Sequence, residues 1–382
     1  MCGRMWSEMM KVFIRLAAFT VLLTAGCTMG GPATGAATPN PTHSPASTVL
    51  ATVVPSPGNP CGAADRCLAL VTLRAGGVIV RDVTDIAHPT TVAQFTPPGG
   101  IRDAQFVSAT EISFIEDVPQ EEGDWVGLAP LSGTNRTVVA KSTRPIIAIA
   151  WSPDGKTLAY LTGSADYTEL HLVTGGQDRV ANTLPAIVGG CETASCADAS
   201  ELRLSYSPDG RFISLVQSFG GPNRIWSSEG KQVFTSDAGV AYRMSTWSGK
   251  SLYFARGDGI VAWQSGTVSP FLPGVSWLRP KGSPAGGQIL FVSRDGSGQG
   301  HVNVVATASR SVRELKQARN QAVFLTARYV WYRGERACVA SDQCDPGLPV
   351  VTTAQSYIYD LQDGTETGSV ISQVFDVWPH AA

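Results

Sequence analysis

The segment WSPDGKTLAY at residues 151–160 decides the fold of this chain. It recurs as YSPDGRFISL at residues 206–215 and, more loosely, as WSGKSLYF at residues 247–254. Apolar residues alternate on both sides of each central turn, which puts one face of a hairpin into a core. Each copy therefore predicts a strand, a tight turn and a second strand.

The two strong copies share the residues that a tight turn needs. Proline fixes φ for the first turn position, aspartate accepts hydrogen bonds from nearby backbone amides, and glycine adopts the positive φ that closes the hairpin. We expect these structural roles for Asp154 and Gly155 in the first copy and for Asp209 and Gly210 in the second.

Weaker copies extend the repeat over most of the chain. Its anchor residues are Phe106, Trp151, Tyr206, Trp247, Leu278, Phe324 and Trp378. Their mean spacing of about 45 residues fits a four-stranded β-propeller blade. Seven anchors predict an all-β fold with a single seven-bladed propeller. The interval from Trp247 to Leu278 is short for a full blade, so a six-bladed ring is the alternative.

The two ends of the repeat region complete each other. Residues 374–379 have the pattern of a first strand whose second strand is missing, whereas residues 67–72 resemble the second strand at 157–162. Strand patterns at 78–83 and 91–95 follow. A propeller avoids an exposed sheet edge by joining strands from its two ends in one blade. We therefore expect the C-terminal strand to close the ring against the N-terminal blade.

These segments resemble the TolB-like and WD-repeat-like β-propellers of bacteria. The resemblance rests on the two strong copies and on ILFVSRDG at residues 289–296, which is similar to the second strand and following turn of the same family. It implies the blade and hardly specifies an activity, because such propellers include partner-binding periplasmic proteins and the non-catalytic domains of peptidases.

The N-terminal residues resemble the signal peptide of a bacterial lipoprotein. Lys11 and Arg15 precede about ten mostly apolar residues, too few for the roughly 20 that span a bilayer. Leu-Thr-Ala-Gly-Cys at 23–27 then ends in Cys27, although Thr24 stands where that pattern more often has leucine. We expect a signal peptide at residues 1–26 and an extracytoplasmic protein held on a bacterial membrane by acyl chains on Cys27. An ordinary secretory signal is the alternative.

A second change of composition follows Cys27. Residues 28–60 are dominated by Gly, Ala, Thr, Pro and Ser and contain no Asp, Glu, Lys or Arg. Such a segment cannot bury enough apolar surface to offset the entropy of ordering it. The chain is therefore divided into the signal peptide, a flexible lipid-anchored tether at 27–60 and the propeller at 61–382.

Six cysteines of the propeller region fall in three close pairs. They are Cys61 with Cys67, Cys191 with Cys196, and Cys338 with Cys344. Outside the cytoplasm such spacing favours three local disulfide bonds, each stapling a small loop. A zinc site is the alternative, but these spacings without a nearby histidine pair fit it poorly.

Charge and motifs restrict the function classes. The chain has 29 Lys plus Arg against 31 Asp plus Glu, so there is no electrostatic argument for nucleic acid as a partner. No GxSxG motif of an α/β-hydrolase is present. His171 and His301 fall in similar strand patterns, which favours equivalent structural positions over a shared metal site. We expect no catalytic set, cofactor or metal centre, and a monomer.

One acidic segment is a weak candidate for a ligand surface. It contains Glu116, Asp117, Glu121, Glu122 and Asp124, and Trp125 follows directly. Carboxylates can bind calcium or act on a glycan, and tryptophan stacks on sugars and peptides. The spacing lacks a calcium-loop pattern, so a solvated hairpin tip is the favoured interpretation. Other tryptophans in strand patterns, Trp226, Trp263, Trp277 and Trp331, are expected to pack between blades.

Two functions remain open from the sequence. The favoured one is a membrane-anchored lipoprotein whose propeller binds or scaffolds a protein or cell-envelope ligand without catalysis. The alternative is an extracytoplasmic hydrolase or lyase that acts on glycans. Three or more carboxylates converging on the channel, with an arginine at its mouth, would favour the enzyme, whereas a broad apolar rim would favour the binding module.

Overall fold

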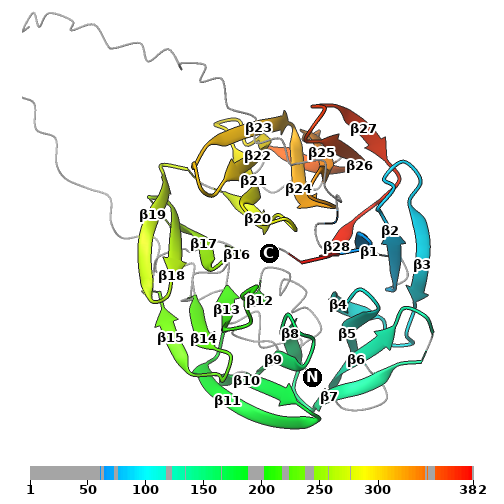
Figure 1. Ribbon diagram of the computed structural model, residues 1–382, viewed down its shortest axis with the longest axis vertical. Coiled ribbons are helices and arrows are strands. Elements are labelled where there is room, and N and C mark those ends of the chain that lie inside the picture. The colour runs from blue at the N-terminus through cyan, green and yellow to red at the C-terminus, as the bar shows by residue number, and fades with distance from the viewer. Residues whose placement is uncertain are drawn as a thin grey trace, which may run out of the picture. The chain divides into compact units, whose positions relative to one another are not determined.

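Seven four-stranded antiparallel sheets form a ring in the computed structural model, so the predicted seven-bladed propeller is confirmed (Figure 1). The structure describes residues 61, 64–72, 76–117, 123–133, 135–164, 166–187, 202–216, 223–236, 245–256, 258–275, 277–339, 342 and 349–380. Within these ranges no helix is long and apolar enough to cross a membrane.

The strands are given blade by blade, from the innermost to the outermost. Blade 1 contains β28 (Val374–Trp378), β1 (Leu68–Thr72), β2 (Val78–Asp82) and β3 (Thr90–Phe95). Blade 2 contains β4 (Ile101–Ser108), β5 (Glu111–Asp117), β6 (Asp124–Pro130) and β7 (Thr137–Ser142), and blade 3 contains β8 (Ile146–Trp151), β9 (Thr157–Gly163), β10 (Tyr167–Thr174) and β11 (Gln177–Pro185). Blade 4 contains β12 (Arg203–Tyr206), β13 (Phe212–Val216), β14 (Arg224–Ser227) and β15 (Gln232–Thr235).

The remaining three blades follow the same order. Blade 5 contains β16 (Ser245–Ser248), β17 (Ser251–Arg256), β18 (Gly259–Gln264) and β19 (Thr267–Pro273). Blade 6 contains β20 (Leu278–Gly282), β21 (Gln288–Arg294), β22 (Gly300–Ala306) and β23 (Val312–Gln317). Blade 7 contains β24 (Arg319–Phe324), β25 (Tyr329–Ala337), β26 (Val350–Asp360) and β27 (Glu366–Ser369).

The C-terminal strand closes the ring as predicted. β28 pairs antiparallel with β1, in a register that places Trp378 opposite Leu68. The closing strand is also joined to blade 2, because the Asp376 carboxylate accepts a hydrogen bond from the Phe106 amide at 2.8 Å. Every sheet in the described ring thus has four strands, and in blade 1 the innermost strand is β28.

The repeated turns have the structure that their residues predict. Gly155 and Gly210 adopt φ values of 67° and 70°. Asp154 accepts hydrogen bonds from the Ser152 hydroxyl and the Lys156 amide, and Asp209 forms the equivalent pair of bonds in blade 4. These four residues therefore have the structural role expected of them.

A related turn begins at Ser283, in blade 6. The Ser283 amide donates to the Gln288 carbonyl at 3.0 Å, as the Ser152 amide does to the Thr157 carbonyl. The true anchor of this repeat is therefore Gly282, and the predicted anchor Leu278 lies too early in β20. Blade 5 is short because its four strands are joined by connections of only two residues, and the six-bladed alternative does not hold.

The core is divided among the interfaces between blades. Each of seven apolar clusters contains buried residues from two neighbouring blades, including one between blades 7 and 1. The tryptophans expected between blades are almost fully buried, with exposures of 0% or 1%: Trp226, Trp263, Trp277 and Trp331. Burying one large side chain stabilises a fold by about 1.5–3 kcal/mol, so these interfaces hold the ring together.

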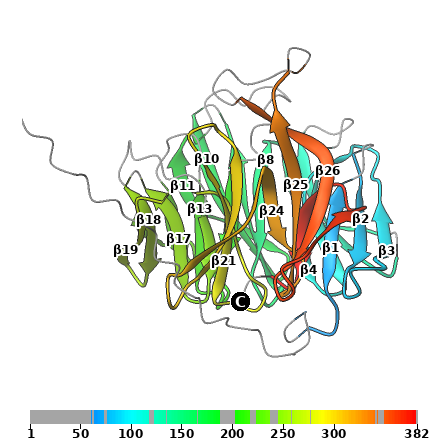
Figure 2. The same ribbon diagram turned by 90° about the horizontal axis from the view of Figure 1, so that it is seen from above.

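The ring has two different ends. We call the end where β28 stops and β1 starts the tether end, because Cys61 lies there next to Cys67. Since strands alternate in direction, all turns from first to second strands lie at the tether end, and all connections from second to third strands lie at the opposite, distal end. Figure 2 shows β25 and β26 reaching past the other blades at one end of the ring, which this topology identifies as the distal end.

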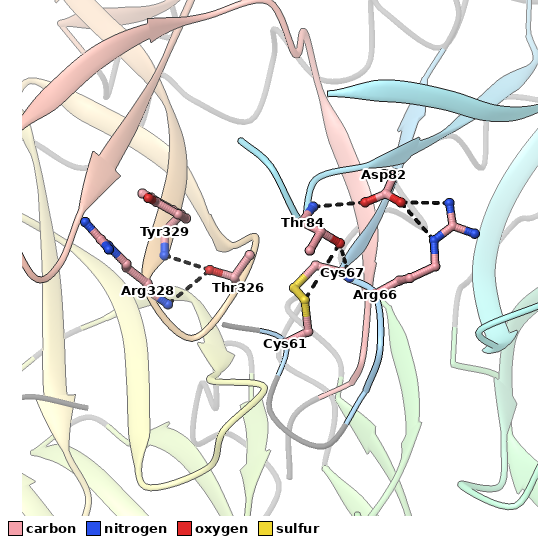
Figure 3. Close-up of a disulfide and its surroundings, with 8 residues drawn as sticks. All are labelled: Cys61, Arg66, Cys67, Asp82, Thr84, Thr326, Arg328 and Tyr329. Atoms are coloured by element: carbon pink, nitrogen blue, oxygen red, sulfur yellow. Dashed lines mark hydrogen bonds and ion pairs between the residues drawn. A yellow bond between two sulfur atoms is a disulfide. The ribbon is translucent and has the colours of Figure 1, made fainter. Parts of the chain in front are cut away.

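A disulfide bond and a polar network fix the chain at the tether end (Figure 3). Cys61 and Cys67 are bonded as predicted, with their Cα atoms 5.2 Å apart. The Cys67 amide donates to the Thr84 hydroxyl at 2.9 Å, and the Asp82 carboxylate binds both the Thr84 amide and the Arg66 guanidinium. The start of the propeller is therefore attached to the turn after β2.

Candidate functional site

Six ionisable side chains from four innermost strands interact near the axis of the ring. They are Asp103 of β4, Arg203 of β12, Arg279 and Lys281 of β20, Asp376 of β28, and His380 just after β28. We call these residues the channel cluster. Its strands belong to blades 2, 4, 6 and 1, so most of its members are separated by an intervening blade. Such residues come close enough to interact only across the axis (Figure 1).

Irregular pairing places three of these side chains. The register of β20 with β21 shifts between Leu278 and Lys281, where Arg279 has φ of 50°. The register of β4 with β5 shifts just before Asp103, and that of β28 with β1 shifts next to Asp376. A β-bulge changes the direction of the side chains beside it and is common next to functional sites. Positive φ is uncommon for residues other than glycine.

Asp376 and His380 form one ion pair in the cluster. The His380 ring nitrogen Nε2 lies 2.9 Å from the Asp376 carboxylate, which also accepts the bond from the Phe106 amide. Burial raises the pKa of Asp376, but His380 and the hydrogen bonds outweigh it and hold that pKa below its usual value. Burial lowers the pKa of His380, and the Asp376 charge outweighs it, so that pKa is raised. The pair therefore favours the charged forms.

Lys281 lies at the centre of the charge distribution. Its ammonium interacts with Arg203, Asp376, Asp103 and Arg279. The Arg203 charge, followed by burial, lowers the pKa of Lys281 to about 7, although the two carboxylates act in the other direction. Burial raises the pKa of Asp103 against the effect of Arg203. Around Lys281 the cluster holds three other cations, Arg203, Arg279 and His380, and two carboxylates, Asp103 and Asp376, and the Arg203 charge has the largest effect on Lys281.

The ring surrounds the channel cluster with protein, which accounts for the effect of burial on its pKa values, but its side chains still contact solvent along the channel. Asp103, Arg203, Arg279 and His380 are exposed, and Lys281 and Asp376 are half-buried. None of these six residues was predicted as a site from the sequence, because they are scattered from position 103 to position 380 and share no local motif. The sequence signal that could have identified them is a charged residue within a predicted strand whose other residues are mostly apolar.

Two carboxylates of the acidic segment are buried and are not part of the solvated tip that we expected. Glu116 and Asp124 lie in β5 and β6 and are 2% and 6% exposed. Glu116 pairs with Arg136 at 2.9 Å, and burial raises its pKa. Asp124 pairs with Arg102 and accepts the Ile146 amide at 2.6 Å, which joins blade 2 to blade 3. For these two carboxylates the prediction is wrong, because both are used in the packing of the fold.

The other members of the predicted ligand surface are only partly described. Trp125 lies in β6 and is half-buried, with the Lys141 ammonium 4.1 Å from the centre of its ring. The Arg136 guanidinium lies 5.9 Å from the same ring. Cation–π contacts of this kind cover part of the ring surface. Glu121 and Glu122 lie outside the described residues.

The predicted cysteine sites are likewise only partly described. Cys338 follows β25 at the distal end and is disulfide-bonded, while its expected partner Cys344 lies outside the described residues. Cys191, Cys196 and the lipidation residue Cys27 also lie outside them.

His171 and His301 occupy the third strands of blades 3 and 6, as the sequence predicts. Each ring nitrogen Nδ1 is near a carboxylate of the fourth strand, 3.2 Å from Asp178 for His171 and 3.0 Å from Glu314 for His301. The described residues contain no group of three histidine, cysteine or acidic side chains that could hold a metal ion.

The long β25–β26 hairpin is the most prominent distal feature of the described chain. Glu335, 8% exposed, accepts the Gly300 amide at 2.8 Å and pairs with Arg294 at 3.0 Å, which fixes the hairpin to blade 6. Near its tip, Arg336 forms two hydrogen bonds with the Asp342 carboxylate, at 2.6 and 2.7 Å. Val339 is 54% exposed beside the bonded Cys338.

Comparison with known proteins supports the fold and gives limited information beyond it. No family model matches the sequence. The chain is 29% identical over 86 residues to the Tol-Pal system protein TolB of Blochmanniella pennsylvanica (strain BPEN), a match that covers 22% of this chain and 18% of that protein.

Solved structures are similar at low sequence identity. A functionally unknown protein from Desulfotomaculum acetoxidans DSM 771 has a TM-score of 0.52 at 11% identity, covering 84% of this chain and all of that one. The tricorn protease has a TM-score of 0.51 at 15% identity, covering 80% of this chain and 33% of that one. These similarities show a shared propeller fold, and the local match to TolB agrees with the resemblance found in the blade motif.

Proposed function

We propose that the protein is a lipid-anchored, extracytoplasmic β-propeller that binds a protein or cell-envelope ligand without catalysing a reaction. The signal-like residues 1–26 and Cys27 support the anchor, and the charge-free segment 28–60 supports a flexible connection. The local similarity to TolB, a protein of the Tol-Pal system, supports a role in the cell envelope.

The observation that carries the proposal is the difference between the two ends of the ring. The described chain enters at the tether end, where the Cys61–Cys67 bond holds it. The β25–β26 hairpin extends from the opposite end, where Arg336 and Asp342 form an ion pair and Cys338 is disulfide-bonded. A tether attached at one end leaves the other end free to face a ligand. The hairpin is preorganised, which reduces the ordering cost of binding.

The glycan-active alternative has less support from the channel. It would need three or more carboxylates converging on the axis, and the described channel cluster contains two, Asp103 and Asp376. One of them, Asp376, is already bound to His380 and to a backbone amide. The described residues therefore give no specific observation in favour of that alternative.

Site-specific photo-crosslinking in the bacterial host tests the binding role. A photoreactive phenylalanine derivative replaces Val339 at the distal end or, as the matched control, exposed Lys250 in the tether-end turn between β16 and β17. We expect a discrete cross-linked species with the Val339 variant and none with the Lys250 variant. The same species from both positions, or none from Val339, would contradict a distal binding end.

A further inference from the structure

We propose that the channel cluster is a binding site for an oxyanion group, a carboxylate or a phosphate-like tetrahedral anion, which Arg203 and Lys281 hold between them. The inference goes beyond the proposed function, because Lys281 lies next to the tether-end turn that begins at Ser283 and the site is therefore separate from the distal hairpin. It follows from the position, pairing and charge of these two cations.

The first step is their convergence from opposite parts of the ring. Arg203 is the first residue of β12 in blade 4, and Lys281 lies in β20 in blade 6, with all of blade 5 between them in the ring order. Both strands are the innermost of their blades, and the Arg203 charge acts on the Lys281 ammonium. Both side chains must therefore extend toward the axis, where a small ligand can contact them together.

The second step is their hydrogen-bonding capacity. In the part of the chain that the structure describes, no carboxylate lies within ion-pair distance of the Arg203 guanidinium or the Lys281 ammonium. The two carboxylates of the cluster act on these cations at longer range and also accept other hydrogen bonds. Asp376 accepts bonds from Phe106 and His380, and Asp103 accepts the amide of Ala104. The donors of Arg203 and Lys281 are thus available to an incoming anion.

The third step is the sign of the field. Two cations held close together repel each other in a partly desolvated site, and the low pKa of Lys281 is the consequence. An anion placed between them removes that repulsion and gains charge-assisted hydrogen bonds. Arginine adds a planar pair of donors that matches carboxylate and phosphate oxygens, and lysine adds a point charge.

The fourth step is the irregular backbone of β20 directly before Lys281. Arg279 has φ of 50° at the position where the β20–β21 register shifts, directly before Lys281. A regular strand would alternate its side chains between the two neighbouring blades. The bulge costs backbone energy, and residues in such conformations cluster at ligand sites.

Binding should depend on pH through Lys281. The charged groups facing it are Arg203 from β12, Asp103 from β4, Asp376 and His380 from the end of blade 1, and Arg279 from its own strand. Of the neighbouring inner strands, β16 has no ionisable side chain, and Arg319 of β24 is paired with Glu366. An anion binds the protonated lysine, so its affinity should fall as pH rises from 6 to 8.

Isothermal titration calorimetry on the full-length protein in detergent tests the inference. Sulfate is the tetrahedral probe because its charge is constant over this pH range, and acetate is the carboxylate probe, both at fixed ionic strength. The variants are Arg203→Met, Lys281→Met and Lys281→Arg. Lys250→Met is the matched control, because it removes one exposed lysine charge that is not part of the channel cluster.

At least one probe should bind wild-type protein saturably, and the probe that binds more tightly identifies the geometry of the group. We expect about ten-fold weaker binding in Arg203→Met and Lys281→Met at pH 6, equivalent to about one pKa unit of interaction. Lys250→Met should differ from wild type by less than about two-fold. Lys281→Arg should bind with little change between pH 6 and 8, and His380→Gln accounts for any pH dependence that His380 adds.

The results that would overturn the oxyanion site differ from those that would overturn the proposed function. Equal binding by wild type and Lys281→Met, or no saturable binding of either probe, would overturn the oxyanion site. Melting curves check that each variant is folded, and Lys281→Arg keeps the charge if the methionine variant is not. The assay does not involve Cys27 or Val339, so the oxyanion site can fail while the anchored binding function stands, and the reverse also holds.

Discussion

Replacing Asp376 with alanine should destabilise the whole propeller through the closing strand. The Phe106 amide, in a residue with no exposed surface, would lose the acceptor that it has at 2.8 Å. A buried donor left without a partner costs about 1–3 kcal/mol. The ion pair with His380, whose side chain is 44% exposed, adds less than about 1 kcal/mol. We expect a total loss of about 2–3 kcal/mol in the free energy of unfolding.

Urea unfolding followed by tryptophan fluorescence measures this loss. Asp376→Asn keeps an acceptor oxygen for Phe106 and should recover most of the stability. Asp363→Ala is a matched control, because Asp363 is 53% exposed and its partner Arg328 also binds Asp360. It should cost no more than about 0.5–1 kcal/mol. An Asp376→Ala variant as stable as the control would refute the role of this bond in ring closure.

The difference in unfolding free energy between wild type and Asp376→Asn should change with pH in a direction that follows from two pKa shifts. The pKa of Asp376 lies below the ordinary value of 3.8, so its contribution is present above that pH and is lost as pH falls through the folded-state pKa. The pKa of His380 lies above 6.5, so its contribution is present below that pH and is lost as pH rises through its folded-state pKa. The stability difference between wild type and Asp376→Asn should therefore be largest between about pH 4 and 6.5.

Two further predictions concern the distal end and the disulfides. Glu335→Ala should destabilise the protein by about 2–4 kcal/mol, because it leaves Arg294 and the Gly300 amide without their buried partner. Amide hydrogen exchange at Gly300 should therefore rise, and an unchanged exchange rate would contradict this expectation. Non-reducing peptide mapping should link Cys61 to Cys67, Cys191 to Cys196 and Cys338 to Cys344; any long-range link would contradict the loop-staple interpretation.

The fold could be predicted because its determinants are local and repeated. The turn at Asp154 and Gly155 is encoded by consecutive residues, so it was recognisable in two blades without knowledge of any contact. Blade 6 was misplaced because Ser283 begins a turn without the aspartate of the motif. There, the Gly282 amide is bound by the Thr246 hydroxyl of the neighbouring blade, a contact that sequence spacing does not show.

The candidate site could not be predicted for the opposite reason. The residues around Arg203 and Lys281 in the sequence do not indicate a site. The two side chains interact only because the ring brings blades 4 and 6 to a common axis. Asp124 illustrates the same limit. Its acidic neighbours suggested a solvated tip, whereas the adjacent blade supplies the Ile146 amide that keeps it buried.

The mass of the mature N-terminus, together with detergent partitioning, tests lipid anchoring of the propeller on Cys27 most directly. We expect an N-terminal peptide that begins at Cys27 and carries the added mass of acyl chains, and a protein that enters the detergent phase. Cys27→Ser should move the protein to the aqueous phase, whereas Cys2→Ser, the matched control, should not. A mature protein with an unmodified Cys27, or unchanged partitioning of Cys27→Ser, would contradict the claim.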